Sequence, residues 1–211
     1  AYAESLTDDM LLLEAAYRMT NRNPLGSAAG YGSSFPLNRT MTTELLGFDS
    51  MDYNVVYAQM GRGKNERNVA FALAGIAGTV AKLAFDACLY NSQNFGFVKL
   101  PDECTTGSSI MPQKYNPDVL ELVRSKTATV LGLQVAALSQ LHAMPGGYNR
   151  DLQDSKGLYM KGLSVTRTTL RIMAKMVEGI SIDEEKLRAG FIPGVLNTDV
   201  YDEIITATTE E

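Results

Sequence analysis

Apolar residues recur along most of the chain at the three- and four-residue spacing of amphipathic helices. Between residues 66 and 94 the spacing alternates for three heptads, the period of a helix-bundle seam, through Val69, Leu73, Ile76, Val80, Leu83, Ala87 and Tyr90. A helix of this length would measure roughly 43 Å. Gly75 and Gly78 interrupt the run. Because glycine costs about 1 kcal/mol in a helix relative to alanine, we expect another helix to approach closely at both positions.

A second long helix is predicted from Pro117 to about His142. Its start carries three favourable signals: Asn116 is a good N-cap, Pro117 suits the first helical position, and Asp118 complements the positive end of the helix dipole. The alternation of three and four continues along this helix through Leu120, Val123, Thr127, Val130, Gln134, Ala137 and Leu141.

A third long helix is predicted over residues 152–179, ended by Gly179, with an inward face formed by Leu163, Leu170, Met173 and Val177. Helical periodicity also opens the chain, in a stripe formed by Leu6, Met10, Leu13 and Tyr17. Shorter helices are predicted over residues 41–47, where Gly47 ends the helix, from Ser181 onward, and over residues 204–211.

The intervening segments indicate an all-α fold of long, nearly antiparallel helices. Residues 23–40 are rich in Gly, Pro, Ser and Asn and predict a loop, and no alternating run of six residues predicts a strand. We expect residues 1–180 to form a central helical bundle domain that is incomplete at its N-terminal side, and residues 181–211 to begin a small helical C-terminal domain. Ala1 follows no cap and the last helix has no stop signal, so we expect a fragment of a longer protein.

Composition excludes several classes of protein. The 211 residues carry 19 Lys and Arg against 24 Asp and Glu, so a net charge of −5 offers no basic field for nucleic acid or an acidic membrane surface. No apolar run in the sequence reaches the roughly 18 residues of a membrane span. Cys88 and Cys104 match no zinc or disulfide pattern, which predicts packing roles, a reducing cytoplasmic location and no metal.

The segment between the two best-marked helices, residues 105–121, has the chemistry of an anion site. Gly107 lets the chain bend, Ser108 and Ser109 supply hydroxyls, and Lys114 and Asn116 supply a positive charge and a carboxamide. The helix that begins at Pro117 adds unpaired N–H groups and about half a positive charge. A carboxylate or a phosphate would fit equally well, and a capped helix after a polar loop is the structural alternative.

This segment also resembles a known motif. GSSIMPQKYNPDVLELVRSK, residues 107–126, resembles the pattern GSSxMPxKxNPxxxE of the fumarase/aspartase superfamily, and its MPQK and LELVRSK portions are most similar to the argininosuccinate lyase branch. Three further segments are similar to that branch in the same order: PLGSAAGYGSSFPLNR at 24–39, YNRDLQDSK at 148–156 and LNTDVYDEII at 196–205. The likeness covers nearly the whole chain.

The resemblance implies a carbon–nitrogen lyase without a cofactor. Such an enzyme would reversibly eliminate argininosuccinate to arginine and fumarate, the last step of arginine biosynthesis, through a carbanion with aci-carboxylate character. Ser108 would be the general base, and Lys114 and Asn116 would stabilise the developing negative charge. Gly107 and the polar loop would form a lid over the substrate. Glu121 would hold a histidine that lies outside this chain.

The resemblance also assigns substrate contacts and an assembly. Substrate would be bound by Ser109, Met111, Arg62, Tyr148, Gln153 and Lys156, where Arg62 matches its motif only after a shift of one residue. His142, the only histidine, is expected to be structural or on the surface. The family builds composite active sites from three chains of a homotetramer, so this chain alone should be inactive.

Departures from the pattern leave alternatives open. Tyr115 replaces a common lysine, and residues 54–66 and 30–34 differ from the usual sequences, which suggests an N-acylated argininosuccinate as an alternative substrate. Another fumarate-releasing member of the superfamily, such as adenylosuccinate lyase, aspartase or fumarase, is a second alternative. A structural protein of the same fold, such as a lens protein, is the alternative outside enzymes.

Overall fold

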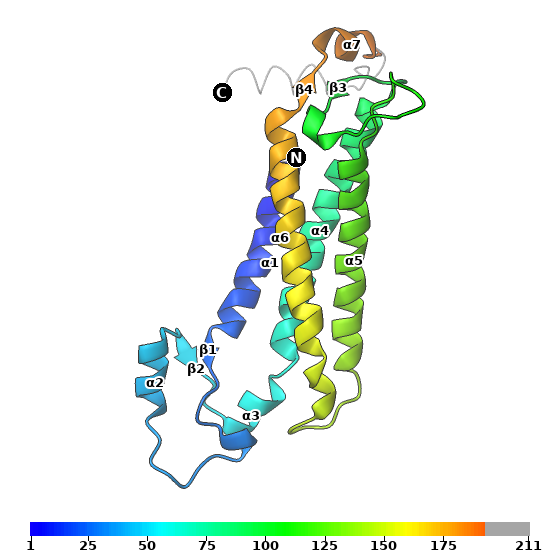
Figure 1. Ribbon diagram of the computed structural model, residues 1–211. Helices are drawn as coiled ribbons and strands as arrows, with labels where there is room; N and C mark the ends of the chain where they lie inside the picture. Colours follow the sequence, from blue (N-terminus) through cyan, green and yellow to red (C-terminus); the bar gives the residue numbers. More distant parts are fainter. Residues whose placement is uncertain (193–211) are drawn as a thin grey trace, which may run out of the picture.

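The computed structural model describes residues 1–192 and is dominated by an antiparallel helical bundle (Figure 1). Its long helices are α1 (Tyr2–Thr20), α4 (Lys64–Asn91), α5 (Asp118–Gln140) and α6 (Ser155–Gly179). Successive long helices run in opposite directions, and α4 lies against each of the other three. The predicted all-α class and nearly antiparallel arrangement are confirmed. The predicted helix 204–211 and the segment 196–205 lie outside the described residues.

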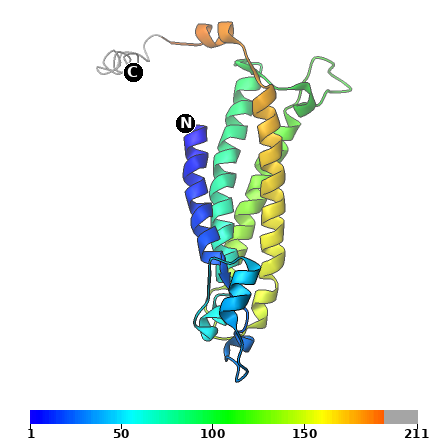
Figure 2. The ribbon, with the colours of Figure 1, turned by 90° about the vertical axis from the view of Figure 1, so that its left-hand side faces the viewer.

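Short elements occupy the two ends of the bundle. They are α2 (Arg39–Leu46), α3 (Val55–Met60), α7 (Glu184–Ala189), the 3₁₀ turns Ala28–Gly30, Asp102–Cys104 and Arg150–Gln153, and the two-residue strands β1 (Arg22–Asn23), β2 (Ser50–Met51), β3 (Val98–Lys99) and β4 (Ser181–Ile182). β1 pairs with β2 in parallel, and β3 pairs with β4 in antiparallel fashion. Figure 2 shows α2 and the loop before it at the end of the bundle opposite to α7.

The core follows the predicted seams of α4 and α5. The inward positions of α4 and α5 are buried at Val69, Leu73, Ile76, Val80, Ala87, Leu120, Val123, Thr127, Val130 and Ala137. Leu120 and Val123 of α5 pack with Ile76 and Val80 of α4 and with Met173 and Met176 of α6. Leu120 is fully buried at 0% exposure, so the first turn of α5 is fixed to the bundle.

Four side chains predicted on inward faces are exposed instead: Val177, Met10, Tyr17 and, in α4, Tyr90 at 39%. Val177 was expected inside, but it is 54% exposed, and Met176 is buried at 1% in its place. In α1, Leu6 and Leu13 pack against the core as predicted, whereas Met10 and Tyr17 are 54% and 62% exposed. The spacing of apolar residues gives the period of a helix but not its rotation. A shift of one residue moves the inward position by about 100° around the helix axis.

Gly75 and Gly78 of α4 differ in their surroundings. A Cβ at Gly75 would lie 2.9 Å from the Asp9 Oδ1 atom of α1, so the predicted close approach is confirmed there. At Gly78 nothing lies within 4 Å of the same position, so the prediction is wrong for the described residues. The contact between α1 and α4 near Gly75 includes a polar pair, in which the Thr79 hydroxyl of α4 donates to Asp9 Oδ2 of α1 at 2.7 Å.

The start of α5 also differs from the expectation. Asn116 does not cap the helix; Pro117 is the N-cap residue and the helix begins at Asp118. The backbone of Asn116 is paired instead with Thr106, in an isolated antiparallel bridge. Gly179 is the last residue of α6, as predicted. The cap residue that follows it, Ile180, is extended, so α6 does not end in the left-handed conformation of a glycine cap. Gly47 does adopt that conformation at the end of α2, with φ +71°.

The predicted 23–40 loop is held by one asparagine and one arginine. Asn23 is completely buried, and its carboxamide donates to Thr43 at 2.9 Å and accepts from the Leu25 amide at 2.9 Å. Arg39 donates to the carbonyls of Leu25 at 2.8 Å and Asp52 at 2.7 Å. These bonds satisfy backbone groups that the irregular segment would otherwise leave unpaired.

Helix α4 is long and apolar enough to cross a membrane by length and composition alone. Its apolar positions Val69, Leu73, Ile76 and Val80 are buried within the bundle, against α1, α5 and α6. We therefore assign it as the core helix of the bundle.

The two interior glycines of α4 provide a test of the α1 contact. Gly78→Ala should raise the free energy of unfolding by about 0.5–1 kcal/mol, because it removes backbone entropy from the unfolded state and meets open space. Gly75→Ala should gain less or lose stability, because its Cβ would press on Asp9. Urea unfolding of the monomeric chain, followed by circular dichroism, measures both. Equal gains would contradict the described α1–α4 contact.

Candidate functional site

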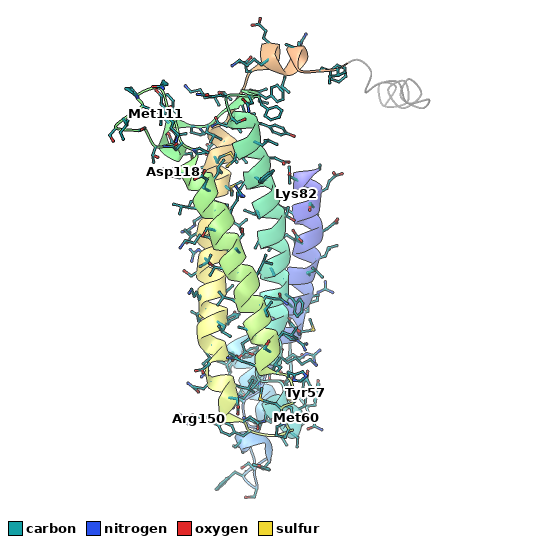
Figure 3. The ribbon with its side chains drawn as sticks, turned by 90° about the vertical axis from the view of Figure 1, so that its right-hand side faces the viewer. Tyr57, Met60, Lys82, Met111, Asp118 and Arg150 are labelled. Carbon is teal, nitrogen blue, oxygen red and sulfur yellow. The ribbon has the colours of Figure 1, made fainter. Side chains whose placement is uncertain are left out.

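The motif segment forms a loop that leaves and re-enters the bundle at neighbouring points. Thr106 and Asn116 close its base, with N–H to carbonyl distances of 3.0 Å and 2.8 Å. The Thr106 hydroxyl also donates to the Asp118 carboxylate in the first turn of α5. Residues 107–115 lie between these anchors, and Figure 3 shows Met111 at the tip of the loop beyond Asp118.

Ser108 has a defined environment within this loop. Its Oγ atom accepts hydrogen bonds from the amides of Met111 at 3.1 Å and Ile110 at 3.3 Å. Ser108 is partly buried, whereas its neighbour Ser109 is exposed. Hydrogen bonds donated to an oxygen stabilise its negatively charged form, so these amides favour an alkoxide at Ser108.

A large open cleft of about 1450 Å³ lies beside the loop. Met111, Lys114, Asn116 and Glu121 line one wall, and the segments around β3 and β4 line the other. Within residues 1–192, Lys114 forms no ion pair, so its charge is free to meet a ligand. Asp118 supplies the first amide of α5 because Pro117 has none. Ser108 and Ser109 are not among the residues lining this cleft.

A second cluster lies at the other end of the bundle. Arg62 stacks over the ring of Tyr148 with its guanidinium carbon 4.8 Å from the ring centre. Arg62 and Lys156 line an open cleft of about 540 Å³ together with Arg22, Tyr57 and Tyr159. Tyr148 and Gln153 are exposed and lie outside that lining.

One guanidinium nitrogen of Arg62 is buried beside this second cluster. The Arg62 Nη1 atom is buried and has no hydrogen-bond partner among the described residues. A buried donor on a cation that lacks a hydrogen-bond partner is costly. Arg62, which fits its motif only after a shift of one residue, lines the second cleft and stacks on Tyr148.

The predicted site residues do not meet within one chain. Ser108, Ser109, Met111, Lys114, Asn116 and Glu121 lie at one end of the bundle, and Arg62, Tyr148, Gln153 and Lys156 lie at the other. Figure 3 shows the same division, with Met111 and Asp118 at one end and Tyr57, Met60 and Arg150 at the other. The 23 residues of α5 separate the ends by roughly 35 Å.

Sequence reasoning missed three polar residues near these clusters. Arg22 and Tyr57 line the second cleft, and they stand on segments whose periodicity was too short to assign. The parallel pairing of β1 with β2 places Arg22 at the second cleft, and no local sequence pattern predicts that pairing. Thr106 lies within the segment 105–121 without a signal of its own, because its bond to Asp118 spans 12 residues.

Comparisons with known proteins identify the family of this chain. Residues 1–132 match the sequence profile of a family described as lyase. The chain belongs to the lyase family of the fumarase/aspartase superfamily. Among the relatives of this chain, the argininosuccinate lyase of Phocaeicola vulgatus is 64% identical over 187 residues, which are 89% of this chain and 42% of that protein.

Solved lyase structures share the fold. EDDS lyase in complex with formate superposes with a TM-score of 0.74 at 28% identity, over 88% of this chain and 37% of that one. Class II fumarase of Schistosoma mansoni gives a TM-score of 0.74 at 18% identity, over 89% of this chain and 44% of that one, and shows the fold alone. The chain spans less than half the length of each of these proteins.

The remaining candidate groups of the sequence have structural surroundings. Cys104 is buried and Cys88 is half-buried against the core. Burial raises the pKa of both thiols; Arg124 lowers that of Cys88 and Glu103 raises that of Cys104 further. His142 is exposed after the end of α5, as predicted. The packing role predicted for both cysteines agrees with these positions.

Thiol labelling tests the assignment of the cysteines. At pH 8 both should react with iodoacetamide at least about threefold more slowly in the folded chain than in urea, because a raised pKa leaves less thiolate. Rates in the folded chain should then rise as the pH approaches 10. Peptide mass spectrometry resolves the two sites. Equal rates in the folded and unfolded chain would contradict their burial.

Proposed function

We propose that the full-length protein is an argininosuccinate lyase, which eliminates argininosuccinate to arginine and fumarate. The identity to proteins of that name supports the assignment, as does the motif over residues 107–126. The observation that carries the proposal is the pair of amides that donate to the Ser108 Oγ atom beside the Lys114 cleft. A cytoplasmic location belongs to the same proposal.

The first chemical step is proton removal from the carbon next to a substrate carboxylate. A neutral serine hydroxyl is too weak a base for this step, so Ser108 must act as an alkoxide. The amides of Ile110 and Met111 stabilise that form, and Lys114 adds a positive charge from the same loop. Closure of the loop over substrate would exclude water and strengthen these interactions.

The second requirement is to stabilise the doubly negative aci-carboxylate that results. Preorganised positive groups placed where charge develops are usually the largest catalytic contribution. Lys114 and Asn116 line the same cleft, and the positive end of α5 begins two residues after Asn116. Loss of the amine then yields fumarate, and its proton comes from a group outside these residues, which Glu121 would orient.

Separation of the two clusters supports a composite site built from different chains. A single substrate is far smaller than the roughly 35 Å length of α5, so one chain cannot offer it both ends. Apolar side chains left exposed on the outer faces support association of copies: on α1 these are Leu11 at 61% and Leu12 at 57%, and on α5 they are Leu122 at 60% and Val135 at 57%. We propose a homotetramer, with residues 1–180 as its bundle domain and residues 181–211 as the start of a second domain.

Replacement of Ser108 tests the assigned base. Ser108→Ala in the full-length protein should lower kcat by about a thousandfold with little change in KM, because the proton acceptor is lost and the binding groups remain. Ser109→Ala should mainly raise KM, and Thr40→Ala at an exposed position of α2 should change neither. Fumarate absorbance with argininosuccinate measures all three.

The same assay separates the alternatives. A faster reaction with N-acylated argininosuccinate would replace the proposed substrate by its acylated form. Fumarate release only from adenylosuccinate, aspartate or malate would assign another branch. No reaction with any of them would favour a structural role, and near-normal kcat in Ser108→Ala would refute the assigned base.

Mixing two inactive variants tests the composite site. Ser108→Ala removes one cluster and Arg62→Ala the other, so a mixed oligomer contains some sites with both clusters intact. Co-refolding equal amounts should restore roughly a quarter of the wild-type turnover, because each site draws its two clusters at random from two chain types. Refolding each variant alone is the control. No recovery in a mixture shown to be mixed would contradict sites shared between chains.

A further inference from the structure

The loop that carries Ser108 has few bonds of its own. Within residues 107–115 the described hydrogen bonds are those to the Ser108 Oγ atom and one turn from the Lys114 amide to the Met111 carbonyl at 2.9 Å. Most of these residues are exposed. The position of Ser108 relative to Lys114 therefore depends on how the loop is held at its base.

The base is held at three points that converge on Thr106. Its amide and carbonyl pair with the carbonyl and amide of Asn116, and its hydroxyl donates to the Asp118 carboxylate. Thr106 lies two residues before Ser108, and Asp118 lies two residues after Asn116. The side-chain bond thus joins the segment that enters the loop directly to the first turn of α5.

Asp118 is a rigid partner because its helix is anchored next to it. Leu120 is fully buried, and its amide bonds the Pro117 carbonyl at 2.9 Å. A hydroxyl that donates to a carboxylate forms a charge-assisted hydrogen bond, which is stronger than a bond between neutral groups. The bond transmits the fixed position of α5 to the start of the flexible loop.

We propose that Thr106 and Asp118 are positioning residues that hold the base of the 107–115 loop and thereby place Ser108. They contact no reacting atom and act through Ser108 and Asn116. The catalytic consequence rests on the proposed function, whereas the mechanical role does not. A purely local role at the helix end would stabilise α5 and leave the loop base unchanged.

Thr106→Val isolates the side-chain bond, since it keeps the shape and the backbone pairing of threonine but loses the hydroxyl. Thr106→Ser restores a hydroxyl. Thr105→Val is the matched control for the exchange measurement, because it removes the neighbouring hydroxyl, which bonds the Asp102 carbonyl at 3.0 Å. Thr105 lines the Lys114 cleft, so its turnover is not used as a control. Asp118→Asn keeps an acceptor without the charge, and thermal melting verifies that each variant is folded.

Hydrogen exchange of the Asn116 amide measures the loop base directly, in this chain and in the full-length protein. Thr106→Val should speed this exchange roughly five- to tenfold, the loss expected for one solvent-exposed, charge-assisted hydrogen bond. Asp118→Asn should have a smaller effect, and Thr106→Ser and Thr105→Val should leave the rate near wild type. An unchanged rate in Thr106→Val, or no rescue by Thr106→Ser, would overturn the proposal.

Turnover of the full-length protein then tests the consequence for Ser108. Thr106→Val should lower kcat about tenfold with KM nearly unchanged, and Thr106→Ser should recover most of it. A loss of kcat in Thr106→Ser as large as that in Thr106→Val would overturn the positioning role. If the wild-type protein releases no fumarate, the proposed function fails, while the exchange rates still decide whether Thr106 and Asp118 hold the loop.

Discussion

The geometry of the candidate site depends on the burial of Leu120 in the first turn of α5. Leu120 packs in one cluster with Leu100 and Cys104, which precede the Ser108 loop, and with Met173 and Met176 of α6. Full burial of a leucine contributes about 1.5–3 kcal/mol. Because this cluster includes residues from both sides of the loop, the entry and exit of the loop are fixed by a single apolar contact region. The exposed polar loop itself has no comparable source of order.

Periodicity predicted the bundle well because each long helix buries a stripe that repeats every three or four residues. The ends of α4, α5 and α6 lie within about three residues of the expected positions, and the buried residues of α5 are those of its predicted seam. These features arise from local spacing and from burial, and a sequence records both directly. The residue types of the Ser108 loop and their resemblance to a family motif are also visible in the sequence, and the catalytic roles assigned to them stay predictions.

Features that depend on contacts between distant segments were not predicted correctly. Asn116 has the side chain of an N-cap, but its backbone is committed to Thr106, ten residues earlier. Gly75 lies against α1, whereas Gly78 has open space beside it. This difference depends on which side of α4 is covered by α1. The division of the site residues between two ends follows from the direction of each helix. None of these facts has a signature within a short window of sequence.

The length of α5 has an evolutionary consequence. If sites are shared between chains, the spacing between the two clusters must match the spacing between neighbouring copies. Insertion of one residue in α5 would rotate the Ser108 loop by about 100° and shift it by about 1.5 Å, and insertion of a heptad would shift it by about 10 Å. Substitutions on the helix surfaces leave this spacing unchanged. Insertions and deletions should therefore accumulate among homologues in segments such as the loop before α2, and be rare within the three long helices that follow it.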